Sequence, residues 1–207
     1  MQVRSSRTQA ERREATRRQL LAAAKTLFVA HGFAQTSTPE VAQLAGVTRG
    51  ALYHHFEDKC ALFLAVAMQA AHEVACSVEQ ASSGPLQSPF EALKIGARAY
   101  FEAMSGQGRA RLLLLEAPAV LSSTQLLALS QAAGAEALHA GLREALGIER
   151  VPEPQLTALA DMMSAAFDRA ALAVVQGAPL AHHLAATVIL LDGLQAWLAK
   201  APVLREG

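Results

Sequence analysis

The apolar residues of this chain recur at helical spacing along most of its length, and no stretch alternates apolar and polar residues long enough to indicate a sheet. The first helix is expected over about residues 9–31. Its apolar face is formed by Leu20, Ala24, Leu27, Phe28 and His31. Gly32 follows, so we expect a left-handed helix stop there, with Phe33 folded back onto Phe28.

Capping signals divide the rest of the chain. Ser37 and Glu40 form a capping box at the start of a short second helix, which ends near Gly46. Thr48 caps a third short helix over about residues 49–55, and Asp58 caps a long fourth helix over about residues 59–80. Later helices are expected from the capping box of residues 88–91 to about residue 104, then over 109–117 up to Pro118, 123–146 up to Gly147, 154–176 and 181–200.

These patterns predict an all-α protein of about nine helices, with two domains. Residues 1–60 are expected to form a three-helix domain, because two short helices joined by a glycine-containing turn are typical of a helix-turn-helix. Residues 61–207 are expected to form a helical domain for ligand binding and dimerisation.

Charge is distributed unevenly, although the chain has 18 basic and 18 acidic residues. Residues 1–60 hold nine Lys and Arg against five Asp and Glu, a net charge of +4, and the remainder has −4. A basic N-terminal part indicates an anionic partner for that part. A solvated charged helix would have the same composition, so charge does not decide between the two interpretations.

The run from Val41 to Lys59 reads V-A-x-x-A-G-V-T-x-G-A-L-Y-H-H-F-x-x-K and is followed by Leu62. Upstream, residues 24–33 read A-x-x-L-F-x-x-x-G-F. In these motifs, which cover about the first 65 residues, the chain resembles the TetR family of one-component repressors. The resemblance implies a sequence-specific DNA-binding regulator of transcription, a repressor released from a palindromic operator by a small apolar ligand.

The resemblance also implies roles for residues of the motif. Thr48, Arg49 and Ala51 would reach base edges at the start of the recognition helix. Tyr53, His54 and Lys59 would contact phosphates, as would the hydroxyls and free amides of residues 36–38. The full expected DNA-binding set is Thr36, Ser37, Thr38, Thr48, Arg49, Gly50, Ala51, Tyr53, His54, His55 and Lys59.

The last two helices are apolar on nearly every side, so each needs cover on two sides. In a chain of this size one cover would be a second copy, and we expect a two-fold homodimer with a four-helix interface. The expected interface residues are Leu156, Leu159, Met163, Val188, Leu191, Leu194, Trp197 and Leu198.

The middle helices are expected to enclose an apolar effector cavity, because Met and Phe side chains suit a pliable ligand site. The effector's identity does not follow from the sequence. The expected lining residues are Arg98, Tyr100, Phe101, Met104, Leu112, Glu116, His139, Met163 and Phe167, with Asp168 as a further polar candidate.

Two other functional classes were considered. An enzyme lacks support, because the sequence has no phosphate-binding loop, nucleophile elbow or paired-histidine metal motif. A redox-responsive regulator would act through Cys60 at the start of its helix, although Glu57 and Asp58 oppose a thiolate there. We expect no metal, cofactor or membrane partner, and a reduced, cytoplasmic protein, because Cys60 and Cys76 would lie about 24 Å apart on one helix.

Overall fold

The computed structural model describes residues 8–84 and 88–200, and every regular element in these ranges is helical. Taken as continuous runs, the described residues form nine helical segments, which confirms the predicted all-α class. In chain order the elements are α1 (Gln9–Gln35), α2 (Thr38–Leu44), α3 (Arg49–His55), α4 (Lys59–Ser82), α5 (Pro89–Ser105), η1 (Arg111–Glu116), α6 (Ala117–Val120), α7 (Ser123–Ser130), η2 (Gln131–Ala135), α8 (Glu136–Leu146), α9 (Glu153–Val175) and α10 (Leu180–Lys200).

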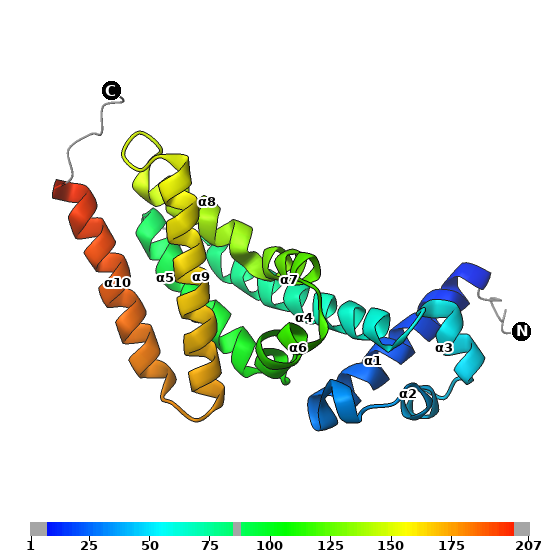
Figure 1. Cartoon of the computed structure of the whole chain (residues 1–207). Helices are drawn as coiled ribbons and strands as arrows, with labels where there is room; N and C mark the ends of the chain where they lie inside the picture. Colours follow the sequence, from blue (N-terminus) through cyan, green and yellow to red (C-terminus); the bar gives the residue numbers. More distant parts are fainter. Residues whose placement is uncertain (1–7, 85–87, 201–207) are drawn as a thin grey trace, which may run out of the picture.

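The helices form a small head and a larger body (Figure 1). The head consists of α1, α2 and α3, and the body of α5 to α10 with η1 and η2. Helix α4 runs from one to the other and contacts α1 at its start and α5 along most of its length. Any tilt of α4 would therefore change the position of the head relative to the body.

Helix α4 forms the centre of the core. Its buried residues are Leu62, Phe63, Val66, Ala67, Ala70, Ala71 and Val74. The alanines let α5 and η2 approach closely, because they place only a methyl group between the helices. Among the described residues, α4 is the one helix whose length and composition would suffice to cross a membrane. Its apolar side is packed within the core, as in the central helix of a globular domain.

The predicted helix caps are confirmed at Thr48 and Asp58, whose side chains accept the backbone N–H groups three residues later. At Ser88 the prediction of a reciprocal box is half wrong. Its hydroxyl accepts the N–H of Glu91, but the Glu91 carboxylate pairs with Lys94 at 2.9 Å instead of reaching back.

Two expected helix boundaries are wrong, each because of a local irregularity. Pro118 does not end its helix, because the π-helical segment η1 precedes it. There Ala117 N–H bonds the carbonyl of Leu112, five residues back, and this wider turn accommodates the proline ring. The expected helix over residues 123–146 is three segments, because Gly134 has a φ of +114°, a value that L side chains rarely adopt.

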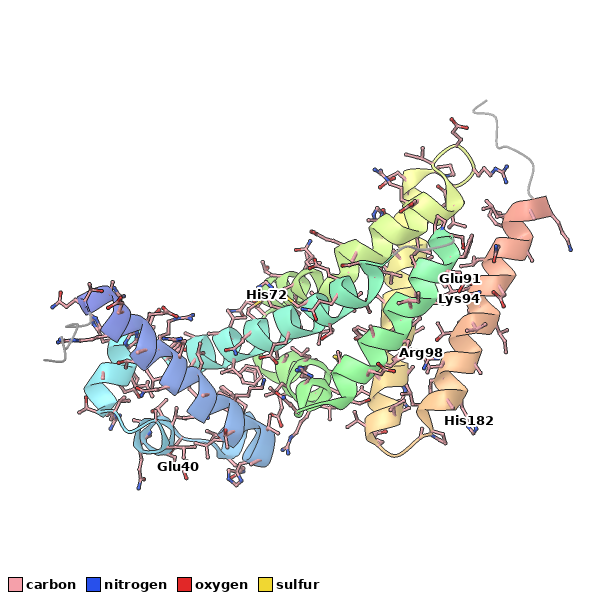
Figure 2. The ribbon with its side chains drawn as sticks, turned by 180° about the vertical axis from the view of Figure 1, so that it is seen from behind. Glu40, His72, Glu91, Lys94, Arg98 and His182 are labelled. Atoms are coloured by element: carbon pink, nitrogen blue, oxygen red, sulfur yellow. The ribbon has the colours of Figure 1, made fainter. Side chains whose placement is uncertain are left out.

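Helix α10 packs on α5 beside α9. Figure 2 shows Glu91, Lys94 and Arg98 along the side of α5 that faces α10. The ammonium group of Lys94 lies 2.8 Å from the carboxylate of Asp192 on α10. This ion pair joins α10 to α5 at a partly exposed position.

Candidate DNA-binding surface and effector cavity

Residues 37–55 form a helix-turn-helix. The carboxylate of Glu40 accepts the N–H of Ser37 at 2.8 Å, and the hydroxyl of Ser37 accepts the N–H of Glu40 at 3.4 Å. These two hydrogen bonds form the predicted capping box at the start of α2. Gly46 has a φ of +68°, a left-handed conformation that reverses the chain after α2. Thr48 then caps α3 by accepting the N–H of Ala51 at 3.1 Å.

Helix α3 has one anchored side and one free side. Leu52 is fully buried in the hydrophobic core, and α3 packs against α2. Ala51 and His55 are half-buried. The residues exposed on or beside α3 are Thr48, Arg49, Gly50, Tyr53 and His54. The structure therefore brings the predicted contact residues of α3 to one outward surface.

Tyr53 connects α3 to α2 at this surface. Its hydroxyl lies 3.0 Å from the hydroxyl of Thr38, and the Arg49 guanidinium carbon lies 5.4 Å from the centre of its ring. The hydrogen bond with Thr38, followed by the contact with Arg49, lowers the pKa of the Tyr53 phenol. These contacts hold Arg49 and Tyr53 in a defined relative orientation before any ligand is present.

Arginines of α1 extend the positive surface beside α3. Arg17 lies 5.6 Å from the centre of the Phe56 ring, at the end of α3. Desolvation lowers the pKa of His55, and the positive charges of His54, Arg13 and Arg17 lower it further. His54, Arg13 and Arg17 therefore lie near His55, and the negative charge of Glu14 acts on the His55 pKa in the opposite direction.

Three of the residues expected to contact phosphate have hydrogen-bond partners within the chain. Thr36 is buried, and its hydroxyl donates to the carbonyl of Gly32 at 2.8 Å, so the expected phosphate contact is wrong for this side chain. Thr38 is also buried against Tyr53. Lys59 donates to the carbonyls of Phe33 and Thr36 at 2.9 and 3.1 Å, so the start of α4 is joined to the end of α1.

A polar junction that the sequence did not indicate joins the head to the body. The carboxylate of Glu116 accepts the N–H of Phe33 at 2.9 Å, and Arg111 donates to the carbonyl of Val29 at 2.8 Å. Gly32, with a φ of +80°, makes room, since a Cβ there would lie 2.6 Å from the Glu116 carboxylate. The sequence analysis expected Glu116 to line an effector site, and this is wrong. Glu116 instead holds the end of α1.

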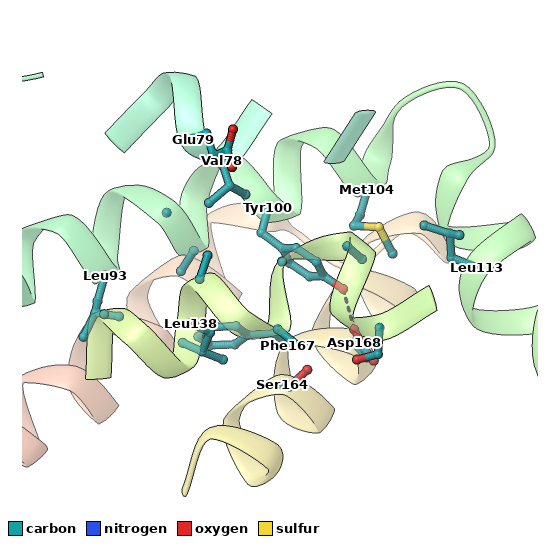
Figure 3. A pocket seen from close by; sticks show the side chains of 18 of the residues that line it. Val78, Glu79, Leu93, Tyr100, Met104, Leu113, Leu138, Ser164, Phe167 and Asp168 are labelled. Atoms are coloured by element: carbon teal, nitrogen blue, oxygen red, sulfur yellow. Dashed lines mark hydrogen bonds between the residues drawn. The ribbon is translucent and has the colours of Figure 1, made fainter. Parts of the chain in front are cut away.

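A cavity of about 710 Å³ lies between α4, α5, α7, α8 and α9 (Figure 3). Along α5 it is lined at helical spacing by Leu93, Gly96, Ala97, Tyr100 and Met104. Figure 3 shows the phenol of Tyr100 directed at Asp168 of α9, to which it donates a hydrogen bond. This volume lies within the range of about 300–1,000 Å³ that small-molecule sites occupy.

Of the nine residues expected to line the cavity, Tyr100, Met104 and Phe167 do so, together with the further candidate Asp168. Arg98 is exposed near Glu102, and His139 pairs with Glu153 at 3.3 Å. Phe101, Leu112 and Met163 are buried in the hydrophobic core and do not line the cavity. The prediction is wrong for Arg98, which is exposed. It is also wrong for Phe101, Leu112, Glu116, His139 and Met163, because their side chains lie outside the cavity.

The cavity residues that the sequence analysis missed include small ones, such as Gly96 on α5 and Gly141 on α8. Glycine has no side chain, so it leaves space between helices. An expectation based on aromatic and methionine side chains does not include such positions. A signal existed in α5, where Ala92, Gly96, Tyr100 and Met104 follow one another at intervals of four residues.

The outward side of α9 and α10 differs from the expected interface. Leu156, Met163 and Leu191 are buried within the subunit, so they are not available to a second copy and the prediction is wrong for them. Leu159, Leu194 and Leu198 pack partly against the core. Val188 and Trp197 are exposed, as expected. The outer face of α9 and α10 is formed by Met162, Val175, Val188, Ile189, Leu190 and Trp197.

Comparison with protein families identifies both parts of the chain. A family described as bacterial regulatory proteins, tetR family, matches residues 20–66, which include the helix-turn-helix. A second, described as tetracyclin repressor-like, C-terminal domain, matches residues 90–196, just over half of the chain. The chain belongs to the TetR family. This assignment leaves the alternative of a helical-bundle enzyme without support.

Individual relatives of this TetR-family protein resemble it over part of its length. The HTH-type transcriptional repressor BepR of Brucella suis is 48% identical over 60 residues, which are 29% of this chain and 28% of BepR. The regulator TtgR of Pseudomonas putida is 42% identical over 76 residues, which are 37% of this chain and 35% of TtgR. The matched region thus spans about a third of the length of these relatives.

Solved structures resemble the whole chain. A TetR-family transcriptional regulator from Pectobacterium atrosepticum has a TM-score of 0.67 and 29% identity, covering 97% of this chain and all of the other. The regulator FadR from Bacillus subtilis, solved with stearoyl-CoA, has the same TM-score at 16% identity, covering 87% of this chain and 96% of FadR. The second likeness concerns the fold alone.

Proposed function

We propose that this protein is a transcriptional repressor, which binds a palindromic operator as a homodimer and is released when a small molecule occupies the cavity. The observation that carries the proposal is the exposed side of α3, where Arg49, Tyr53 and His54 face outward while Leu52 anchors the helix. A duplex operator would be bound in the cytoplasm, where we place the protein.

Arg49 is the residue with the chemistry to identify a base. It occupies the first position of α3, the end of a recognition helix that enters the major groove. Its guanidinium can donate two hydrogen bonds to guanine O6 and N7. Tyr53 and His54 lie farther along the helix and suit phosphate contacts, which set the position of α3 without identifying the sequence. The α1 arginines add attraction to the duplex that is independent of sequence.

A second copy suits the outer face of α9 and α10. Ile189 on α10 and Met162 on α9 are each 72% exposed, and Leu190 on α10 is 55% exposed, an unusual degree for apolar side chains. Packing α9 and α10 against the same helices of a second copy would cover them in a four-helix arrangement. The two α3 helices could then enter successive major grooves about 34 Å apart, or a multiple of that distance.

Two connections lead from the cavity to the head. Helix α4 contributes Val78 and Glu79 to the cavity near its end and holds α1 through Lys59 at its start. Segment η1 contributes Leu113 to the cavity and holds α1 through Glu116. A ligand that tilts α4 or shifts η1 would change the spacing of the two α3 helices. A coupling of about 1–3 kcal/mol between the sites is typical of such linkage.

Arg49→Ala and Tyr53→Ala test the role of α3. Against DNA from upstream of its own gene, we expect Arg49→Ala to relax base preference by about 1–3 kcal/mol at the contacted position. We expect Tyr53→Ala to weaken binding to all sequences alike, because it removes a phosphate contact. Fluorescence anisotropy with operator and scrambled duplexes, at several salt concentrations, measures both effects.

Tyr53→Phe is the matched control, because it keeps the ring under Arg49 and removes only the hydroxyl that meets Thr38. We expect this variant to retain base preference and to lose part of the affinity. Wild-type binding that is equally strong on scrambled DNA and disappears with salt would contradict the proposal.

A further inference from the structure

The ionisable groups that line the cavity are of one sign. Its lining includes the carboxylates of Glu79, Glu144 and Asp168 and the phenol of Tyr100, but no Lys, Arg or His side chain. Helices α4, α8 and α9 each contribute one carboxylate. A largely apolar site with this charge attracts a positive group and disfavours an anionic one.

Asp168 is the most buried of the three carboxylates. It is partly buried on α9, and the Tyr100 phenol is the group that donates to it. Burial raises the pKa of Tyr100, and the charge of Asp168 raises it further, so the phenol stays neutral. Burial also raises the pKa of Asp168, against the effect of the Tyr100 hydrogen bond. Among the described residues, no cationic side chain forms an ion pair with Asp168.

Glu79 and Glu144 line the cavity from opposite helices and are exposed. Neither carboxylate forms an ion pair within the described part of the chain, whereas Glu91, Glu116 and Glu153 do. An entering cation would therefore meet two free carboxylates at the accessible side of the cavity and a third, Asp168, deeper inside.

The rest of the lining accommodates a bulky apolar body. From Ala92 to Met104 the lining follows α5 over thirteen residues, a length of about 18 Å. The ring of Tyr100 lies beside Asp168, to which its hydroxyl donates, and the ring of Phe167 lies 6.4 Å from that of Tyr100 between centres. Aromatic faces attract organic cations, most strongly where water is excluded.

We propose that the effector is an apolar organic cation, a hydrophobic amine or a quaternary onium compound, whose charge lies beside Asp168 and the ring of Tyr100. The inference rests on the proposed function, in that it treats this cavity as the effector site. The cation supplies the opposite charge that Asp168 lacks, and the apolar body fills the space beside Gly96 and Leu138.

Calorimetric titration of the full chain with matched probes tests the proposal. Tetraphenylphosphonium and tetraphenylborate have nearly the same size and shape and opposite charge, and triphenylphosphine oxide is a neutral comparison. We expect the phosphonium ion to bind at least about 10-fold more tightly than the borate. Asp168→Asn keeps the shape and the contact with Tyr100, and we expect it to lower phosphonium affinity about 10- to 100-fold while affinity for the neutral probe stays unchanged.

Asp161→Asn is the matched control, since Asp161 is an exposed carboxylate on the same helix and does not line the cavity. It should bind all probes as the wild type does. Glu79→Gln, an exposed rim position that can be changed without a cost to folding, should lower phosphonium affinity by a smaller factor. Circular dichroism checks that each variant is folded.

The outcomes separate this inference from the proposed function. Equal or tighter binding of the borate or the neutral probe overturns the cation inference and leaves an effector cavity. Absence of binding by all three probes also overturns it. Operator binding by wild type and Arg49→Ala is measured without any probe, so its failure contradicts the proposed function while a preference for the phosphonium ion would still support the cation site.

Discussion

Ile189→Glu is expected to make the protein monomeric and to lower its affinity for a two-half-site operator about 10²- to 10⁴-fold, because the second half-site then no longer binds intramolecularly. Ile189 is 72% exposed on α10, in the centre of the outward apolar face. In a two-fold interface the substitution places a carboxylate from each copy in an apolar contact, where neither has a partner. Sedimentation velocity measures the mass, and anisotropy on operators with one and two half-sites measures affinity.

Leu127→Glu is the control for this experiment. Leu127 is 61% exposed on α7, away from α9 and α10, so the variant introduces the same charge on another surface. It should remain dimeric and bind the operator normally. A dimeric Ile189→Glu variant, or a monomeric Leu127→Glu variant, would show that the two copies meet elsewhere.

Phe63→Ala is expected to lower the free energy of unfolding by about 3–5 kcal/mol, the range for large aromatic deletions in a core. Phe63 is fully buried on α4, and its ring lies edge-on to Phe28 and Phe33 of α1 at 5.2 and 5.3 Å. The substitution therefore leaves a cavity at the contact between head and body. Urea unfolding followed by circular dichroism gives the free energy.

Phe63→Leu retains an apolar side chain at the same place, and we expect a smaller loss than for alanine. Operator affinity should fall with Phe63→Ala, because α1 is no longer held firmly on α4. A free energy within about 1 kcal/mol of the wild type would mean that the three rings contribute little to this contact.

The helix-turn-helix could be predicted from the sequence because its signals are local. The capping hydroxyls of Ser37 and Thr48 and the carboxylate of Asp58 act on amides three residues away, so spacing along the chain is enough to recognise them. The burial of Leu52 is likewise predictable from local sequence, because Leu52 is the large apolar residue of a short helix that is otherwise mostly polar.

The junction between head and body could not be predicted in this way. Glu116 meets Phe33 across 83 residues of sequence, and Lys59 meets the last carbonyls of α1, whose free ends are known only when the helix is placed. A charged residue in a helix has many possible partners. The sequence alone therefore left Glu116 as a ligand contact and Lys59 as a phosphate contact.

Local signals in the sequence thus determined the all-helical class and the position of the recognition helix, because caps and short-range periodicity act within one or two turns. Tertiary structure alone decided which side of each apolar helix faces its own subunit. In α10 the buried Leu191 and the exposed Ile189 and Leu190 are equally apolar, and only packing against α5 distinguishes them. The cavity has the same origin, because space left by glycine and alanine exists only once neighbouring helices are in place.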